Sequence, residues 1–242
     1  MKMKRLGETA VSPDGKWLAY SVTTVDLEQN TKTPELWLQA IAPSSESGPN
    51  SESQAPMKLS VAQPKDSGVQ FAPDGKRILF LSGRSGSEQV WLADFDAATG
   101  ATANAKKLTG ISTEAGDAIW SPDGNSILFT SAVYPDCPAI TTTDGGVTGA
   151  PADRSSSVGW SVGDKCNAER DAALAASKVK AQIFTHLLYR HWDHFTGDKR
   201  THLFLASVGT GAVRDLTPND AHDVPPFSLG GGGCGCAFAP DS

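Results

Sequence analysis

The sequence lacks both clustered basic residues and long apolar runs. Its 242 residues carry a net charge of −6, and nowhere do three basic residues stand together. Binding to a phosphate backbone depends on clustered Lys and Arg, so we expect no nucleic-acid partner. A membrane-spanning helix needs roughly 18 consecutive apolar residues, and the sequence contains no such stretch. We therefore also expect no membrane span.

The N-terminus lacks the apolar segment of an export signal. Met1–Arg5 is basic, like the start of a signal peptide, but Leu6–Thr9 follows where an apolar stretch is required. The protein is then either cytoplasmic or exported by a signal that lies upstream of this chain. The sequence carries no recognisable cofactor motif, and we expect no cofactor.

Cysteine is scarce, with four residues in the chain. Cys137 and Cys166 lie in a stretch rich in Ser, Gly, Thr and Pro, which has little apolar material for a core of its own. Closing the loop between them would stabilise this stretch by about 3–4 kcal/mol in the chain-entropy model. We expect a disulfide between Cys137 and Cys166, as in loop-rich segments from oxidising compartments. The alternative is two free, partly buried thiols.

The other two cysteines, Cys234 and Cys236, are separated by one glycine. In an extended strand, residues two apart lie about 6.6 Å from each other on one face, which is near the upper limit for a disulfide. A mutual disulfide would need a distorted loop, which the preceding run Gly230–Gly233 could allow. Two thiols alone do not complete a zinc site, so we predict no metal and leave the partners of both cysteines open.

Glycine and proline are plentiful, with 24 and 15 residues, and they mark a repeated turn. The four copies are Ser12–Gly15, Ala72–Gly75, Ser121–Gly124 and Ala239–Ser242. Pro presets φ at the second position of a type I turn, Asp tolerates the third position, and Gly accepts a positive φ at the fourth. Such turns join antiparallel strands.

Strand-like segments recur in a fixed order around these turns. A strand follows each complete turn, over Lys16–Ser21, Arg77–Ser82 and Ser126–Ser131. A third strand is expected at Leu36–Leu38, Val90–Leu92 and Leu203–Leu205, and a fourth at Leu59–Ser60, Leu108–Thr109 and Leu216–Thr217. Four short strands in a recurring order are typical of a β-propeller blade. The alternative is an irregular β-sandwich in which the turns recur by coincidence.

The expected fold is all-β: a partial β-propeller of four-stranded antiparallel blades, with TolB-like repeats. The predicted blades cover about 6–60, 67–110 and 116–217, with the start of a fourth at 222–242. The third blade carries a partly helical insertion over 132–200. Propellers close with about four to eight blades, so we expect this chain to be a fragment or to need a partner for closure.

Within the insertion, Gly159–Gly163 matches G-x-S-x-G, the nucleophile elbow of α/β-hydrolases. That elbow needs a buried strand before the Ser, but the preceding Ala152–Ser157 is polar. An ordinary loop at Gly159–Gly163 is the better interpretation, and Ser161 is not predicted to be a nucleophile. A helix is expected from Lys165 to Lys180, with Asp164 as its N-cap.

The segment Tyr189–Phe195 combines aromatic and polar side chains more densely than any other. Thr196–Asp198 is a plausible turn into the next strand, so the segment is expected to form a hairpin with it. Alternation along a strand separates His191 and Asp193 from His194, which argues against a three-ligand metal site. The weak candidates for contact with a substrate are Arg190, His191 and Asp193.

Two stretches resemble a known family. Ala10–Trp17 resembles the first propeller blade of the prolyl oligopeptidase family of serine peptidases. A second stretch, Ser177–Lys180 followed by Leu187–Asp193, is similar to the acylaminoacyl-peptidase and dipeptidyl-peptidase branch of that family, and Tyr189–Asp193 is its more specific part. Members of that branch carry a similar insertion with a comparable cysteine pair.

The resemblance implies a propeller that gates and orients peptide substrates for a C-terminal α/β-hydrolase domain. That domain is absent from this sequence, so no catalytic residue is carried over and we expect the chain alone to be inactive. The resemblance also implies a periplasmic or secreted location, in agreement with the Cys137–Cys166 disulfide. The competing hypothesis is a TolB-like protein-binding propeller without peptidase activity.

Overall fold

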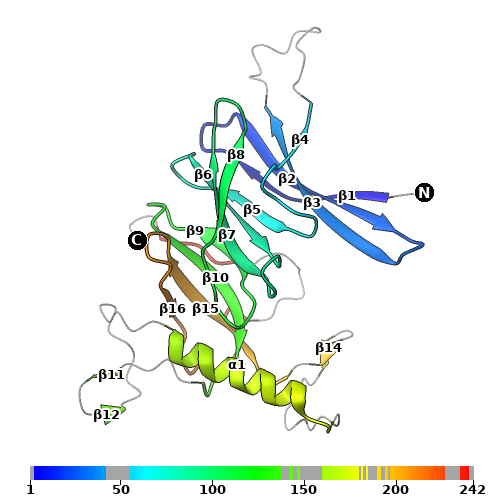
Figure 1. The fold of residues 1–242 in the computed structure, drawn as a ribbon. Helices are drawn as coiled ribbons and strands as arrows, with labels where there is room; N and C mark the ends of the chain where they lie inside the picture. Colours follow the sequence, from blue (N-terminus) through cyan, green and yellow to red (C-terminus); the bar gives the residue numbers. More distant parts are fainter. Residues whose placement is uncertain are drawn as a thin grey trace.

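The computed structural model describes residues 3–41, 55–137, 142–143, 146–147, 160–179, 181, 184, 190–191, 194–195, 197–226 and 235–239. Three antiparallel sheets of four strands make up most of this part of the chain. Figure 1 shows them following one another as an arc. The expected all-β fold of four-stranded blades is confirmed.

The strands of each sheet follow one another in sequence order. The first sheet contains β1 (Met3–Val11), β2 (Trp17–Asp26), β3 (Thr31–Ala40) and β4 (Met57–Lys58). The second contains β5 (Ser67–Phe71), β6 (Arg77–Ser82), β7 (Gln89–Phe95) and β8 (Thr102–Lys107). The third contains β9 (Gly116–Trp120), β10 (Ser126–Val133), β15 (Arg200–Ser207) and β16 (Val213–Asp215). The first strand of the second sheet, β5, contacts both β1 and β9, so the three first strands are neighbours.

The three complete Pro-Asp-Gly turns have the expected geometry. The glycines have φ angles of 71°, 65° and 68° at Gly15, Gly75 and Gly124. Each glycine N–H donates to the carbonyl of the first turn residue at 2.9 Å. A positive φ has little steric cost only for glycine. The same Pro-Asp-Gly sequence therefore forms the same hairpin turn in each sheet.

The core lies between the sheets. Along β6, Ile78 and Phe80 pack into a cluster shared with the first sheet, whereas Leu79 and Leu81 pack into a cluster shared with the third sheet. Because alternate side chains of β6 are buried on opposite faces, the strand is a continuous apolar run rather than an alternating one. The second strand of the second sheet therefore holds its two neighbours together.

The fourth strands lie slightly earlier in the chain than predicted. They end at Lys58, Lys107 and Asp215, one residue before the predicted Leu59, Leu108 and Leu216. Each of these leucines nevertheless donates its backbone N–H to the predicted third strand, at Leu36, Val90 and Leu203 respectively. The predicted pairing is thus present, while the assigned strand boundaries are displaced.

One helix, α1 (Ser161–Ala176), lies in the chain between β10 and β15, and Figure 1 shows it across the end of the third sheet. The predicted start at Lys165 and the predicted loop up to Gly163 are wrong, because the helix begins at Ser161. Trp160 occupies the N-cap position without a side-chain cap bond. The expected N-cap, Asp164, instead accepts the backbone N–H of Ser112 at 2.6 Å and so ties the helix to the loop before β9.

Four strands of two residues each are also present between β10 and β15 in the described part of the chain. They form two short ladders, β11 (Thr142–Thr143) with β12 (Gly146–Val147), and β13 (Arg190–His191) with β14 (His194–Phe195). The hairpin expected through Thr196–Asp198 is wrong, because β14 pairs with β13 and not with β15. The reason is that both edges of β15 are occupied, one by β10 and the other by β16 and the backbone N–H groups of Leu216 and Val224.

Candidate functional site at the meeting of the first strands

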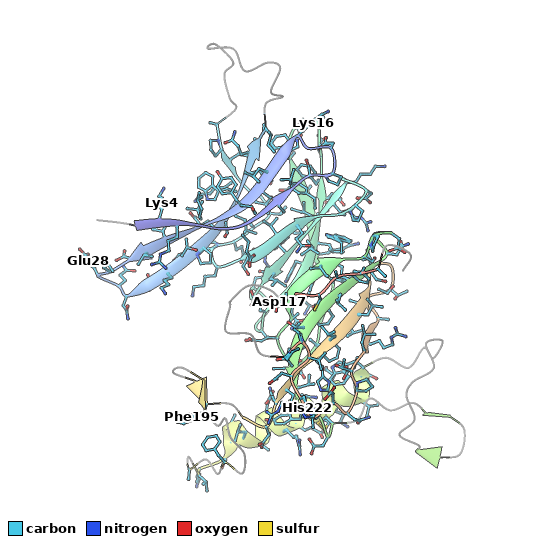
Figure 2. All side chains as sticks on the ribbon, turned by 180° about the vertical axis from the view of Figure 1, so that it is seen from behind. Lys4, Lys16, Glu28, Asp117, Phe195 and His222 are labelled. Atoms are coloured by element: carbon cyan, nitrogen blue, oxygen red, sulfur yellow. A yellow bond between two sulfur atoms is a disulfide. The ribbon has the colours of Figure 1, made fainter. Side chains whose placement is uncertain are left out.

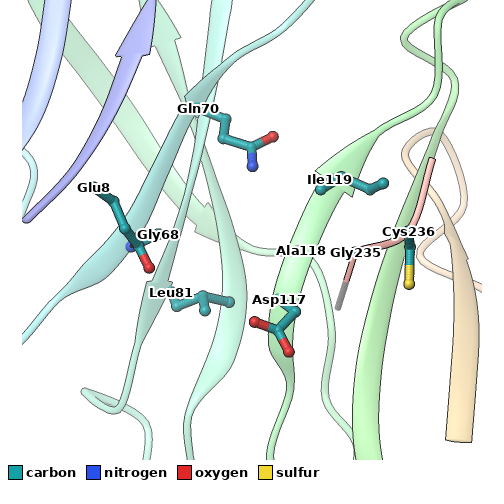
Figure 3. A pocket seen from close by; sticks show the side chains of 9 residues that line it. All are labelled: Glu8, Gly68, Gln70, Leu81, Asp117, Ala118, Ile119, Gly235 and Cys236. Atoms are coloured by element: carbon teal, nitrogen blue, oxygen red, sulfur yellow. The ribbon is translucent and has the colours of Figure 1, made fainter. Parts of the chain in front are cut away.

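A cavity of about 180 Å³ lies where the first strands of the three sheets meet. Figure 3 shows its lining, with side chains from β1 and the second sheet on one side and from β9 and the segment 235–239 on the other. Its lining residues are Glu8, Gly68, Gln70, Leu81, Asp117, Ala118, Ile119, Gly235 and Cys236. We call this cavity the axial pocket.

The axial pocket is built from one repeat position. Glu8, Gly68, Asp117 and Gly235 each stand four residues before the first residue of a Pro-Asp turn, and all four line the pocket. The repeat that produces the sheets therefore also brings one residue from every copy to the same place.

The backbone at this position departs from a regular strand. The pairing of each first strand with its second strand is interrupted by a bulge here. Three of the four residues have a left-handed backbone conformation, with φ of 63° at Gly68, 47° at Asp117 and 61° at Gly235. Gly and Asp are among the residues that tolerate this region, and a bulge re-aims the side chain that it carries.

Two carboxylates, on Glu8 and Asp117, give the axial pocket its chemistry. Glu8 Oε2 accepts the backbone N–H of Gly68 at 3.1 Å, which links β1 to β5. Asp117 Oδ2 accepts the hydroxyl of Thr130 at 3.3 Å. A carboxylate has about four acceptor positions, so both groups retain capacity for a ligand that donates hydrogen bonds or carries positive charge.

A further acidic residue, Glu88, lies beside Ser67, the residue before Gly68 of the axial pocket. Burial raises the pKa of Glu88, the hydroxyl of Ser67 opposes that effect, and the negative charges of Glu114, Asp66 and Glu8 raise the pKa further. The Ser67 hydroxyl lies 3.3 Å from Glu88 Oε1. Glu8 and Glu88 are thus close enough to repel one another, and the negative potential near Glu8 favours cations over anions.

The sequence-predicted contact residues lie elsewhere. Arg190 and His191 form β13, of which the structure describes the backbone, and Asp193 lies outside the described residues. Their role in binding a substrate stays a prediction. The residues of the axial pocket were not singled out from the sequence, although the common offset of Glu8 and Asp117 from their turns was a signal for them.

The predicted disulfide is confirmed. Cys137 and Cys166 are bonded, with their Cα atoms 5.6 Å apart, and the bond ties the end of β10 to α1. Cys236 is disulfide-bonded as well. Cys234, whose partner the sequence left open, lies outside the described residues.

The G-x-S-x-G motif has a packing explanation at its second glycine. A β-carbon on Gly163 would lie 2.5 Å from the ring of Trp160, so only glycine fits there. Trp160 is itself buried and packs edge-on against Phe204 of β15, with ring centroids 4.9 Å apart. Ser161 is the first residue of α1 and is exposed.

Among the residues that the structure describes, no group of three or more His, Cys, Asp and Glu is placed to hold a metal ion. No helix in the described part of the chain is long and apolar enough to span a membrane.

No family model matches the chain. Dipeptidyl-peptidase 5 of Porphyromonas gingivalis is 23% identical over 230 residues, which are 93% of this chain and 27% of that protein. An uncharacterized peptidase of Bacillus subtilis, YuxL, is 24% identical over 222 residues, which are 91% of this chain and 27% of that protein.

The fold has a counterpart among solved structures. The acylaminoacyl peptidase of Pyrococcus horikoshii superposes with a TM-score of 0.51 at 15% identity, over 87% of this chain and 24% of that chain. This chain therefore spans about a quarter of the length of the peptidases that it matches. The resemblance expected from the sequence is confirmed: the chain is related to a part of peptidases of the prolyl oligopeptidase family.

Proposed function

We propose that this chain is the non-catalytic propeller portion of a serine exopeptidase or oligopeptidase of the acylaminoacyl- or dipeptidyl-peptidase type. In this role it gates and orients peptide substrates for an α/β-hydrolase domain. The observation that carries the proposal is the similarity to dipeptidyl-peptidase 5, which extends over 93% of this chain but only 27% of the relative. Such proportions suit one domain of a larger enzyme.

The axial pocket supplies a physical means of gating. The carboxylates of Glu8 and Asp117 stand on the first strands β1 and β9, at the same repeat position. A peptide that approaches with its positively charged N-terminus is attracted, and one that leads with its C-terminal carboxylate is repelled. The pocket would therefore orient a peptide as well as admit it.

Binding of matched peptides to the full chain tests this proposal. A short alanine peptide, labelled at its C-terminus, is titrated by fluorescence anisotropy with a free and with an acetylated N-terminus. We expect the free amine to bind roughly two- to fivefold more tightly, the size of an exposed ion pair. The substitutions Glu8→Gln and Asp117→Asn should remove that difference.

Glu28→Gln is the matched control for the peptide experiment. Figure 2 shows Glu28 at the far end of the first sheet, away from Asp117, and Glu28 is exposed. This variant should keep the preference for the free amine. Equal binding of both peptides by the unmodified chain would contradict orientation by charge, and tight binding of folded proteins instead of peptides would favour a TolB-like binding module.

We further propose a periplasmic or secreted location, since the Cys137–Cys166 disulfide suits an oxidising compartment. Mass spectrometry of the protein isolated from its host under acid quench tests this. A bonded pair is expected, and alkylatable Cys137 would refute the proposal.

A further inference from the structure

His202 on β15 is almost completely buried, with 1% of its surface exposed. Its Nδ1 lies 2.8 Å from Oδ2 of Asp215 on β16, and its Nε2 lies 3.0 Å from the backbone carbonyl oxygen of Asp220. Both ring nitrogens thus have a partner at hydrogen-bond distance, and neither partner is a donor when Asp215 is ionised.

The partners define the protonation state that fits this site. The other oxygen of Asp215, Oδ1, accepts the backbone N–H of Thr217 at 2.8 Å, as expected for a carboxylate. The carbonyl of Asp220 can only accept. A neutral imidazole has one N–H, so it would leave a lone pair facing one of these oxygens. The doubly protonated ring satisfies both.

The surroundings of His202 contain acidic groups from two elements. Burial lowers the pKa of His202, but the hydrogen bond and charge of Asp215, together with the carbonyl and charge of Asp220, outweigh it and raise the pKa above its ordinary value. On the neighbouring strand β10, the residue opposite His202 is Ser131, which is uncharged and bonds the hydroxyl of Thr113.

Two other titratable groups lie in the loop that passes His202. His222 is exposed and bonds the side chain of Asp220, and Asp223 accepts the backbone N–H of Thr201 at 2.8 Å. In the described part of the chain, neither His222 nor Asp223 forms a hydrogen bond with the His202 ring, so the pKa of His202 is determined by Asp215 and Asp220.

Of the two partners of His202, Asp215 lies on β16 and Asp220 lies in the loop 216–224, which follows β16. Both ends of this loop are fastened to β15: Leu216 N–H donates to Leu203 O at 2.8 Å, and Val224 N–H donates to Thr201 O at 2.7 Å. The contact between His202 and Asp220 lies between these two attachments. The imidazole therefore joins β15, β16 and the middle of the loop at one buried point.

We propose that His202 is a pH-dependent clamp, which fastens the loop 216–224 to the third sheet while its ring carries two protons and loosens the loop when one proton is lost. The sign follows from the raised pKa. The stabilisation is complete below the ordinary histidine pKa of about 6.5 and disappears as the pH rises through the higher value of the folded protein.

Two measurements on the full chain test the clamp. Nitrogen-15 NMR of the ring should show His202 doubly protonated at pH 6 and should give it a pKa above the ordinary histidine value of about 6.5. Amide exchange of Val224, corrected for its intrinsic rate, should accelerate between pH 6 and pH 9. The exchange should accelerate by up to about tenfold for each unit by which the pKa of His202 in the folded chain exceeds its pKa in the unfolded chain.

Variants separate the clamp from general effects of pH. In His202→Gln the corrected exchange of Val224 should no longer change between these pH values, whereas His222→Gln should behave like the unmodified chain. A neutral His202 ring at pH 6 in the unmodified chain would overturn the proposal, and this readout does not depend on whether the variant folds. Equal acceleration in His202→Gln and the unmodified chain would also overturn it.

Discussion

The indole of Trp17 on β2 lies directly on Gly100 in the loop after β7. A β-carbon on Gly100 would be 2.3 Å from Cη2 of Trp17, and the Trp17 Nε1 donates to the carbonyl of Ala97 at 2.8 Å. This contact joins the first sheet to the second, and it requires a residue without a side chain at Gly100.

Replacing Gly100 tests this junction. In Gly100→Ala, the added methyl overlaps the Trp17 ring, and the φ of 73° is unfavourable for alanine. We expect the free energy of unfolding to fall by about 2–4 kcal/mol in urea denaturation. Gly15→Ala is the matched control, because its φ is 71° and nothing lies within 4 Å of the added carbon. It should cost about 1 kcal/mol, and an equal loss in both variants would mean that the Trp17 contact contributes nothing.

The fold could be predicted from the sequence because its signals are local. Pro, Asp and Gly act within each turn, and the apolar run Ile78–Leu81 follows directly, so neither depends on distant partners. The predictions were wrong where contacts between residues far apart in the sequence determine the local structure. The start of α1 is set by Trp160 packing against β15, and the role of Asp164 is set by a loop that is far away in sequence.

The candidate site could not be predicted in the same way. Glu8 and Asp117 are unremarkable in sequence, and only the neighbouring first strands and their bulges bring them to one pocket. A comparison of equivalent positions before each turn would have aligned them. No sequence pattern links His202 to its partners, because a hairpin separates Asp215 and Asp220 from it along the chain.

Breaking the Cys137–Cys166 disulfide should destabilise the attachment of α1. The double variant Cys137→Ala/Cys166→Ala should lose about 2–4 kcal/mol of unfolding free energy, because the bond no longer restricts the unfolded chain. Urea denaturation monitored by tryptophan fluorescence provides the measurement. Reductant should destabilise the unmodified chain more than the double variant, which keeps the disulfide of Cys236. A reductant effect of the same size in both would assign it to another bond, such as that of Cys236.

The chain by itself should not hydrolyse aminoacyl or acyl-peptide reporter substrates. Ser161, the one serine in a nucleophile-like motif, is the first residue of α1, and the glycine that completes the motif is required by Trp160. Ser161→Ala should therefore fold normally and leave the background rate of a chromogenic assay unchanged. Hydrolysis by the purified chain that Ser161→Ala abolishes would show that the motif is catalytic.

Two of the turn aspartates, Asp14 and Asp123, should keep their charge in acid, and Asp123 most clearly. The Ser121 hydroxyl at 2.6 Å, with the backbone and side-chain N–H groups of Asn125, lowers the pKa of Asp123 to about 2. The stabilisation from a lowered pKa is present above the ordinary Asp value and is lost as the pH falls through about 2. Ser121→Ala removes the largest of these contributions, so the pKa of Asp123 should rise.

Carboxyl carbon-13 NMR of the full chain measures the pKa of Asp123 directly. Ser12→Ala is the matched control, since the Ser12 hydroxyl lowers the pKa of Asp14 in the first turn in the same way. It should raise the pKa of Asp14 and leave Asp123 unchanged. Because Ser121 also bonds the backbone of Ser126, Asn125→Ala serves as a second variant that removes only an Asn125 side-chain bond to Asp123. It should raise the pKa by a smaller amount, and an unchanged value in both Ser121→Ala and Asn125→Ala would contradict the hydrogen-bond explanation.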